Sequence, residues 1–170
     1  LHPDEPLIIE GIHALNPMLL NDDIDRDKLF RVYVSALTTL NIDDHNRIHT
    51  TDARLLRRLV RDYETRGASM EHTLSMWPSV SRGEEKWIFP YQENADALFN
   101  TTLVYEVSVL KKYVYPLLQE VPKESPCYAA ARDITKVLNY FLDADGIEDE
   151  IPPTSILREF IGGCTFYRKD

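Results

Sequence analysis

The sequence is poor in glycine, and its six glycines never adopt the spacing of a phosphate-binding loop. Neither GxxxxGK[ST] nor GxGxxG occurs, so this stretch of chain supplies no glycine-rich cradle for nucleotide phosphates. Cysteine is also scarce. Cys127 and Cys164 show neither CxxC nor metal-ligand spacing, which predicts two free thiols in a reducing compartment rather than a disulfide or a zinc site.

Long apolar runs and an excess of basic charge are absent as well. No hydrophobic run approaches the roughly 20 residues that span a bilayer. The first residues, LHPDEP, lack the basic and apolar regions of a secretion signal. A net charge of -9 and a pI near 5.0 argue against nucleic acid as the main partner. We therefore expect a cytoplasmic protein that binds neither membranes nor nucleic acid.

The pattern of apolar residues predicts strands first and helices afterwards. Buried strands are expected at 6–10 and 29–35, with a weaker one at 94–99. Helices are expected at 41–49, 51–66, from Ser69 towards Trp77, 101–120, 128–142 and 155–161, with a loop at 81–92.

This order is lopsided for a complete fold, because a parallel sheet needs crossovers and several strands. The sequence therefore predicts the C-terminal part of an α/β protein whose other strands lie upstream of residue 1. Residues 1–121 are expected to belong to the α/β domain. Residues 122–170 are expected to form a helical extension that serves packing or the contacts of a homo-oligomer.

The most informative segment is Thr51 to Gly67, TDARLLRRLVRDYETRG. At about 100° per residue its apolar side chains fall on one side of a helix and four of its arginines on the other, and Arg66 follows just before Gly67. Five of the twelve arginines of this acidic chain lie here: Arg54, Arg57, Arg58, Arg61 and Arg66. Guanidinium groups suit phosphate oxygens, so the segment is a candidate phosphate site. The alternative is a solvated helix face, partly neutralised by the three nearby carboxylates.

Two residues near the N-terminus are candidates for chemistry. Glu10 ends an apolar run and precedes Gly11, at the carboxyl end of a predicted strand, where ligands of α/β sheets gather. Its carboxylate is placed either to hold Mg²⁺ against nucleotide phosphates or to accept hydrogen bonds from the next loop. His13 follows in EGIHALNP, either as a contact to a substrate or as a residue that stabilises the turn.

The order of these motifs resembles one known family. EGIHALNP, FRVYVS, DARLLRRLVRDYETRG and ADALFN occur in the sequence in the order found in the uridine kinase and phosphoribulokinase family of P-loop kinases. The similarity extends over about residues 6–120. FPYQENAD, YEVSVLKKY and SILREFIGG further resemble a bacterial branch of uridine kinase-like nucleoside kinases that keeps such a helical tail. The R-x-x-R-R-x-x-R-D-x-x-x-R-G pattern is the most specific of these features.

The resemblance implies part of a P-loop kinase fold, a mostly parallel sheet with flanking helices and a mobile lid. It also implies ATP and Mg²⁺ as cofactors and a nucleoside or sugar phosphate as substrate. Glu10 matches the acidic residue that helps to hold Mg²⁺, and Arg58, together with His13, is expected near the acceptor. Arg61 and Arg66 match catalytic arginines that reach the ATP phosphates, and Arg57 is expected to bind phosphate beside them.

Two departures limit what the resemblance implies. The phosphate loop, its lysine and the catalytic aspartate of the family lie upstream of the segment present here, so this chain alone is expected to be inactive. Uridine kinases also commonly carry Arg after the RG of the lid and Gln about eight residues later. Ala68 and Met76 stand at those positions, so another nucleoside or a sugar phosphate is a possible acceptor. A non-catalytic anion-binding or assembly module is the alternative outside enzymes.

Overall fold

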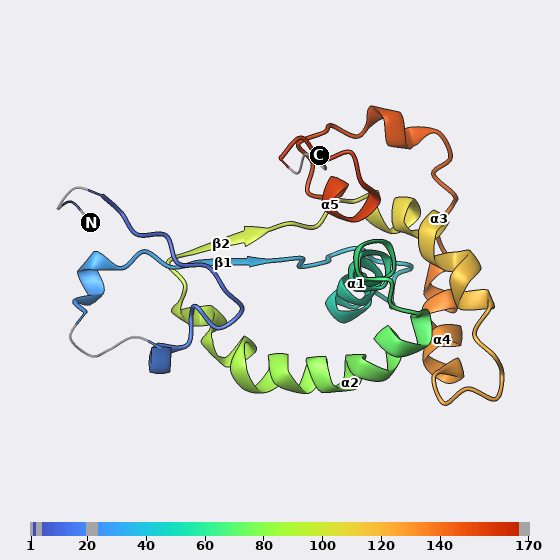
Figure 1. Ribbon diagram of the computed structural model, residues 1–170, viewed down its shortest axis with the longest axis horizontal. Coiled ribbons are helices and arrows are strands. Elements are labelled where there is room, and N and C mark those ends of the chain that lie inside the picture. The colour runs from blue at the N-terminus through green and yellow to red at the C-terminus, as the bar shows by residue number, and fades with distance from the viewer. Residues whose placement is uncertain (1, 3–4, 20–23, 167–170) are drawn as a thin grey trace. The chain divides into compact units, whose positions relative to one another are not determined.

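The computed structural model describes residues 2, 5–19 and 24–166 (Figure 1). The chain folds into two compact units, which are described one at a time. The first unit contains residues 1–35 and 79–99, and the second contains residues 36–78 and 100–170. The regular elements are β1 (Val32–Ser35), α1 (Thr50–Arg66), α2 (Met70–Trp87), β2 (Ala97–Asn100), α3 (Glu106–Gln119), α4 (Tyr128–Leu138) and α5 (Arg158–Ile161), together with four short 3₁₀ turns.

The first unit is built on a parallel sheet of β1 and β2. Its register is fixed where β2 begins, because the N–H groups of Asp96 and Ala97 both donate to the carbonyl of Arg31. The Asp96 carboxylate in turn accepts the N–H of Arg31 at 2.7 Å and an ion pair from Arg26 at 2.7 Å. The predicted strands at 29–35 and 94–99 are thereby confirmed, in shorter form.

The predicted strand at 6–10 is wrong for this structure. Residues 5–10 are extended but form no ladder, and Leu7, Ile8 and Ile9 are 64, 87 and 67% exposed. A strand needs a hydrogen-bonding neighbour, and none of the described residues pairs with this segment. Large apolar side chains of both sheet strands are also exposed, among them Val34 at 57% and Phe99 at 61%. The first unit therefore presents an extensive uncovered apolar surface.

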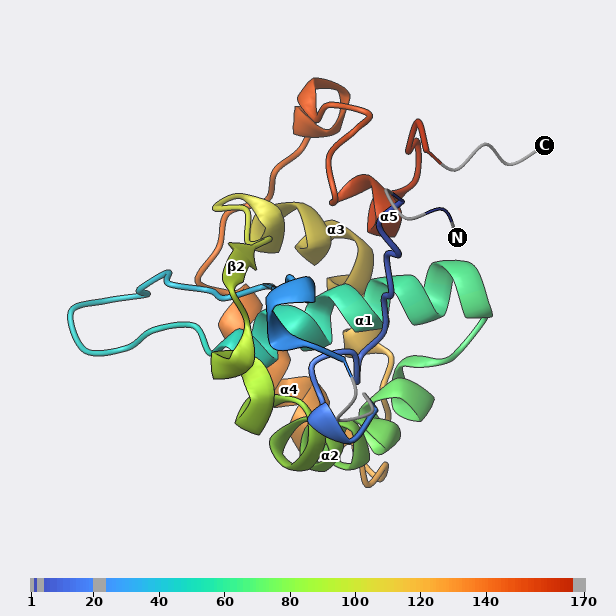
Figure 2. The ribbon, with the colours of Figure 1, turned by 90° about the vertical axis from the view of Figure 1, so that its left-hand side faces the viewer.

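The second unit holds the hydrophobic core. Figures 1 and 2 show α1 beside α3 and α5, and helix α4 packs on α3. The leucines and Val60 of the predicted apolar face of α1 are buried, whereas Tyr63 of the same face is 44% exposed. The core joins α1, α3, α4 and the residue before α5: Leu55, Leu56, Leu59, Val60, Val107, Leu110, Val114, Ile134, Leu138 and Leu157. α4 and α5, which belong to the predicted extension at 122–170, are thus part of the same core as α1 and α3.

Two helix predictions need correction. Residues 41–49 are not helical but form a loop closed by an Asn41–Arg47 bridge. The Asp43 carboxylate accepts the N–H groups of His45 and Asn46 at 2.8 and 2.7 Å, and this local bonding replaces helical hydrogen bonds. Helix α2 continues through Pro78 to Trp87, over most of the predicted loop, because the proline removes only one hydrogen bond between turns of otherwise helix-compatible residues.

The helices predicted at 101–120, 128–142 and 155–161 form but are shorter, and two other boundaries match the sequence. α1 ends at Gly67, which adopts φ 63° in the left-handed region, as expected of a glycine that stops a helix. The Ser69 hydroxyl accepts the N–H of His72, as predicted for the start of α2. None of the described helices is long and apolar enough to cross a membrane.

Candidate functional site

The carboxylate of Asp62 organises three of the five arginines of α1. Its oxygens lie 3.1 Å from Nε of Arg58, 2.8 Å from a terminal nitrogen of Arg66 and 3.9 Å from Nε of Arg61. The Asp62 side chain is only 5% exposed, and the Thr73 hydroxyl of α2 also donates to it at 3.4 Å. We call Arg58, Arg61 and Arg66 the arginine cluster. A nearly buried carboxylate thus holds cations that would otherwise repel one another.

The arginine cluster keeps donors for a ligand. Arg58 contacts Asp62 through Nε, and its two terminal nitrogens have no hydrogen-bond partner in the described part of the chain. Arg66 uses one terminal nitrogen, and its side chain is 56% exposed. A guanidinium carries five N–H donors in a planar fork that fits phosphate oxygens in pairs. The arrangement can therefore bind an anion without breaking the contacts to Asp62.

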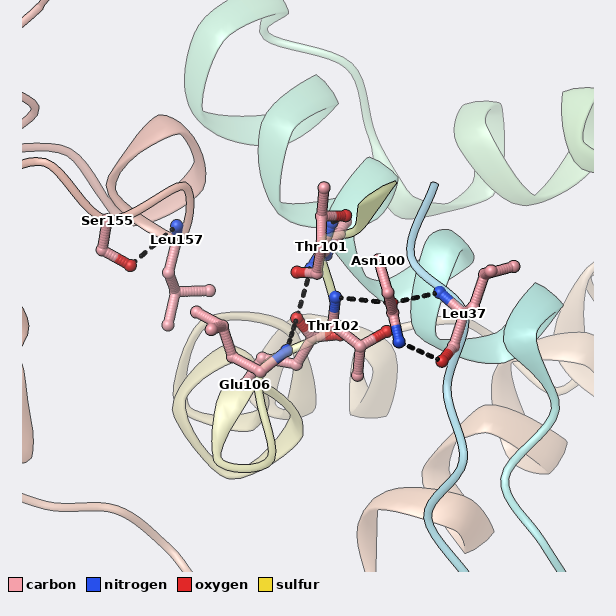
Figure 3. A network of polar contacts seen from close by, with 9 residues as sticks. Leu37, Asn100, Thr101, Thr102, Glu106, Ser155 and Leu157 are labelled. Atoms are coloured by element: carbon pink, nitrogen blue, oxygen red, sulfur yellow. Dashed lines mark hydrogen bonds and ion pairs between the residues drawn. The ribbon is translucent and has the colours of Figure 1, made fainter. Parts of the chain in front are cut away.

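Arg57 has different partners from the arginine cluster. Its side chain is 10% exposed and pairs with the Glu106 carboxylate of α3. It also donates to the hydroxyl and carbonyl of Thr101, at 3.0 and 2.7 Å, and stacks on Phe160 of α5. Figure 3 shows Thr101 and Glu106 in this network. The guanidinium predicted to bind phosphate joins α1 to α3 in this structure, and its contact with phosphate stays a prediction.

The same network ties the end of β2 to the chain that follows β1. The Asn100 amide accepts the N–H of Leu37 at 2.9 Å and donates to its carbonyl at 3.0 Å (Figure 3). Asn100 also accepts the N–H of Thr102 at 3.0 Å. Asn100 is the last residue of the ADALFN motif, so this motif places Thr101 and Glu106 opposite α1.

Glu10 and His13 belong to the first unit. Glu10 is exposed and makes no hydrogen bond or ion pair with any residue that the structure describes. His13 is exposed in a turn, where its carbonyl accepts the N–H of Asn16 at 2.9 Å. Among the described residues no three His, Cys, Asp or Glu side chains gather as a metal site. Since Mg²⁺ is usually held by one or two carboxylates with phosphates and waters, the single unpaired carboxylate of Glu10 fits that ion.

The central position of Asp62 was missed by sequence reasoning, which treated this residue only as one of several neutralising charges. The signal was present in the spacing. Arg58 precedes Asp62 by four residues and Arg66 follows it by four, so all three lie on one stripe of a helix. The same stripe contacts Thr73 of the next helix, and that contact across helices is not encoded in any spacing.

Comparison with known proteins places the chain in a family. Residues 1–108 match the model of the Phosphoribulokinase / Uridine kinase family. Proteins named uridine kinase from Staphylococcus aureus strains JH9, Newman and Mu50 are each 32% identical over 97 residues. The aligned part is 56% of this chain and 39% of each relative. The chain therefore spans about two fifths of the length of these curated relatives. No solved structure matches it significantly.

The family match covers most of the residues singled out above. It includes Glu10, all of α1 and the Arg57–Glu106 pair, and it ends within α3. The predicted fold class is confirmed, since helices with a short parallel sheet are consistent with part of a P-loop kinase fold. The match includes well over half of the residues, so this chain belongs to the Phosphoribulokinase / Uridine kinase family.

Proposed function

We propose that the chain is the C-terminal part of a kinase that transfers the γ-phosphate of ATP to a hydroxyl group of a nucleoside. The observation that carries the proposal is the arginine cluster, three guanidinium groups arranged around one buried carboxylate on α1. The relatives named uridine kinase support a nucleoside as the acceptor. The uncovered apolar surface of the first unit supports an upstream segment that completes the sheet.

Each candidate residue has a specific role in this proposal. Arg61 and Arg66 bind the ATP phosphates and stabilise the charge of the transferring phosphoryl group, which is most of what phosphoryl-transfer catalysis requires. Arg58 and His13 orient the acceptor. Glu10 would hold Mg²⁺, which when bound neutralises charge on the phosphate oxygens. Arg57, buried against α3, keeps the helix that carries the cluster in place.

The test uses the natural protein extended upstream of Leu1. The upstream sequence is expected to contain GxxxxGK[ST], and the extended protein should phosphorylate a nucleoside 5′-hydroxyl with ATP and Mg²⁺. A panel of nucleosides and ribulose phosphate identifies the acceptor, which Ala68 and Met76 leave open. Phosphorylation of the sugar phosphate alone would make the protein phosphoribulokinase-like. No turnover on any acceptor, together with an upstream sequence that lacks the glycine loop, would favour a non-catalytic anion-binding module.

A further inference from the structure

A cavity of about 680 Å³ lies in the second unit beside the C-terminal half of α1. One wall consists of Arg61, Glu64 and Thr65 of α1, and the other is the segment Arg158–Cys164. Cavities of 300–1,000 Å³ are typical of small-molecule sites. The second wall lies outside the family match, which ends at residue 108. The cavity is therefore lined both by Arg61 of the family motif and by the segment Arg158–Cys164, which has no ligand-binding role assigned to it.

Arg61 is poorly satisfied by the residues around it. Among the carboxylates of the described residues, its guanidinium approaches Glu159 at 3.8 Å and Asp62 at 3.9 Å, and both distances are longer than a hydrogen bond. Its Nε is buried and has no hydrogen-bond partner among the described residues. A buried donor without an acceptor costs about 1–3 kcal/mol, so such a group usually belongs to a site that a ligand or water completes. The buried Nε lies 3.9 Å from Asp62, so an oxyanion in the cavity would instead bind the terminal nitrogens, one of which lies 3.8 Å from Glu159.

The opposite wall adds positive charge and further donors. The Arg158 guanidinium donates to the carbonyls of Glu148 and Ile151, at 2.6 and 2.7 Å, and no carboxylate of the described residues lies within ion-pair distance of it. Its charge is therefore held in place but not neutralised. The N–H groups of Gly163 and Cys164 have no acceptor in the described chain. Gly163, at φ 75°, has no side chain, and the Arg158 guanidinium packs against it where a Cβ would lie.

We propose that this cavity binds the polyphosphate of a nucleotide, and that the C-terminal segment Arg158–Cys164 is part of the phosphate site of the kinase. The anion would replace the long contact between Arg61 and Glu159 and would be attracted by the charge of Arg158. Ile161 supplies apolar surface beside it. The inference rests on the proposed function and extends it, because it assigns a ligand-binding role to the tail.

Cys164 provides a direct reporter of occupancy, because it lines the cavity and is half-buried. Cys127 is buried and serves as the internal reference. The 170-residue chain is labelled with a maleimide, and each thiol is quantified by peptide mass spectrometry. Saturating ATP or pyrophosphate should slow the labelling of Cys164 about fivefold or more and leave Cys127 unchanged. Adenosine, which lacks phosphate, should have no effect.

Three substitutions make the test specific. Thr65→Glu places a carboxylate in the cavity and should weaken pyrophosphate binding about tenfold. Thr51→Glu makes the same change at the other end of α1, at an exposed position outside the cavity, and should leave binding unchanged. Glu159→Gln removes the carboxylate that competes for Arg61 and should tighten binding about threefold.

The outcomes separate this inference from the proposed function. Protection of Cys164 that is lost in Thr65→Glu and kept in Thr51→Glu supports the cavity as a polyphosphate site. Absence of protection by both anions, or equal protection in the two variants, overturns it. Kinase activity of the extended protein without protection of Cys164 would leave the proposed function intact and remove only the role of the tail. Protection of Cys164 without kinase activity of the extended protein would keep the cavity as a polyphosphate site and remove the proposed function.

Discussion

Replacement of Asp62 by asparagine separates two roles of the carboxylate. One is to stabilise the fold, and the other is to position the guanidinium groups of the arginine cluster. The side chain is 5% exposed and accepts hydrogen bonds from Arg58 and Arg66 at 3.1 and 2.8 Å. Asparagine keeps an acceptor oxygen and the shape but loses the charge. A hydrogen bond to a charged acceptor is worth about 1.5–3 kcal/mol and a neutral one about 1 kcal/mol. The contribution of Arg66 is discounted because its side chain is 56% exposed.

The expected loss is therefore roughly 2 kcal/mol of unfolding free energy, or a fall in Tm of about 4–8 °C for a chain of this size. Thermal and denaturant unfolding of the 170-residue chain measure it. The matched control is Asp52→Asn in the first turn of α1. Burial raises the pKa of Asp52, so its charge is already disfavoured there, and the control should lose less than about 1 kcal/mol.

The kcat of the extended kinase tests whether Asp62 positions the guanidinium groups or acts only through its negative charge. Removing a negative charge should, by electrostatics alone, strengthen phosphate binding by the arginine cluster. If Asp62 instead positions the guanidinium groups, Asp62→Asn in the extended kinase should lower kcat at least about tenfold while KM for ATP changes little. An unchanged kcat together with the full loss of stability would refute the positioning role. Equal losses of stability in Asp62→Asn and Asp52→Asn would refute the structural calculation.

Three further predictions follow from the structure. Glu106→Gln leaves the Arg57 guanidinium buried without its counter-charge and should cost about 3 kcal/mol in denaturant unfolding, whereas Glu120→Gln at an exposed site should change stability by less than about 0.5 kcal/mol. Hydrogen bonds from Arg26 lower the pKa of Asp96. The ionised Asp96 therefore contributes its full stability to the fold above its unfolded-state pKa, about 3.9, and this contribution is lost as the pH falls through its folded-state pKa. Asp96→Asn should abolish this acid dependence of the unfolding free energy. The isolated chain should bind a hydrophobic dye through its first unit, and addition of the upstream segment should reduce that fluorescence.

The second unit was largely predictable because its signals are local. The 3.6-residue period of α1 and the glycine that ends it are properties of consecutive residues, and the structure reproduces both. Of the failures, one depends on a distant partner and one on a local side chain that competes with the helix. Whether Ile8 lies in a sheet depends on a neighbouring strand, which no periodicity supplies. Whether residues 41–49 form a helix depends on the Asp43 carboxylate, which accepts two backbone N–H groups that a helix would use.

The arginines of α1 show why a site is harder to predict than the helix that carries it. At about 100° per residue, Arg57 lies about 60° from the buried Val60 and Arg58 about 60° from the buried Leu55, so both lie at an edge of the apolar face. The two are adjacent and chemically identical in sequence. α3 decides between them, because Glu106 supplies a buried counter-charge for Arg57 and for no other arginine of the helix. The guanidinium that α3 neutralises joins the two helices, whereas those gathered at Asp62 keep the donors that the proposal assigns to phosphate. The role of Arg57 within the motif is therefore set by Glu106, a partner distant in sequence.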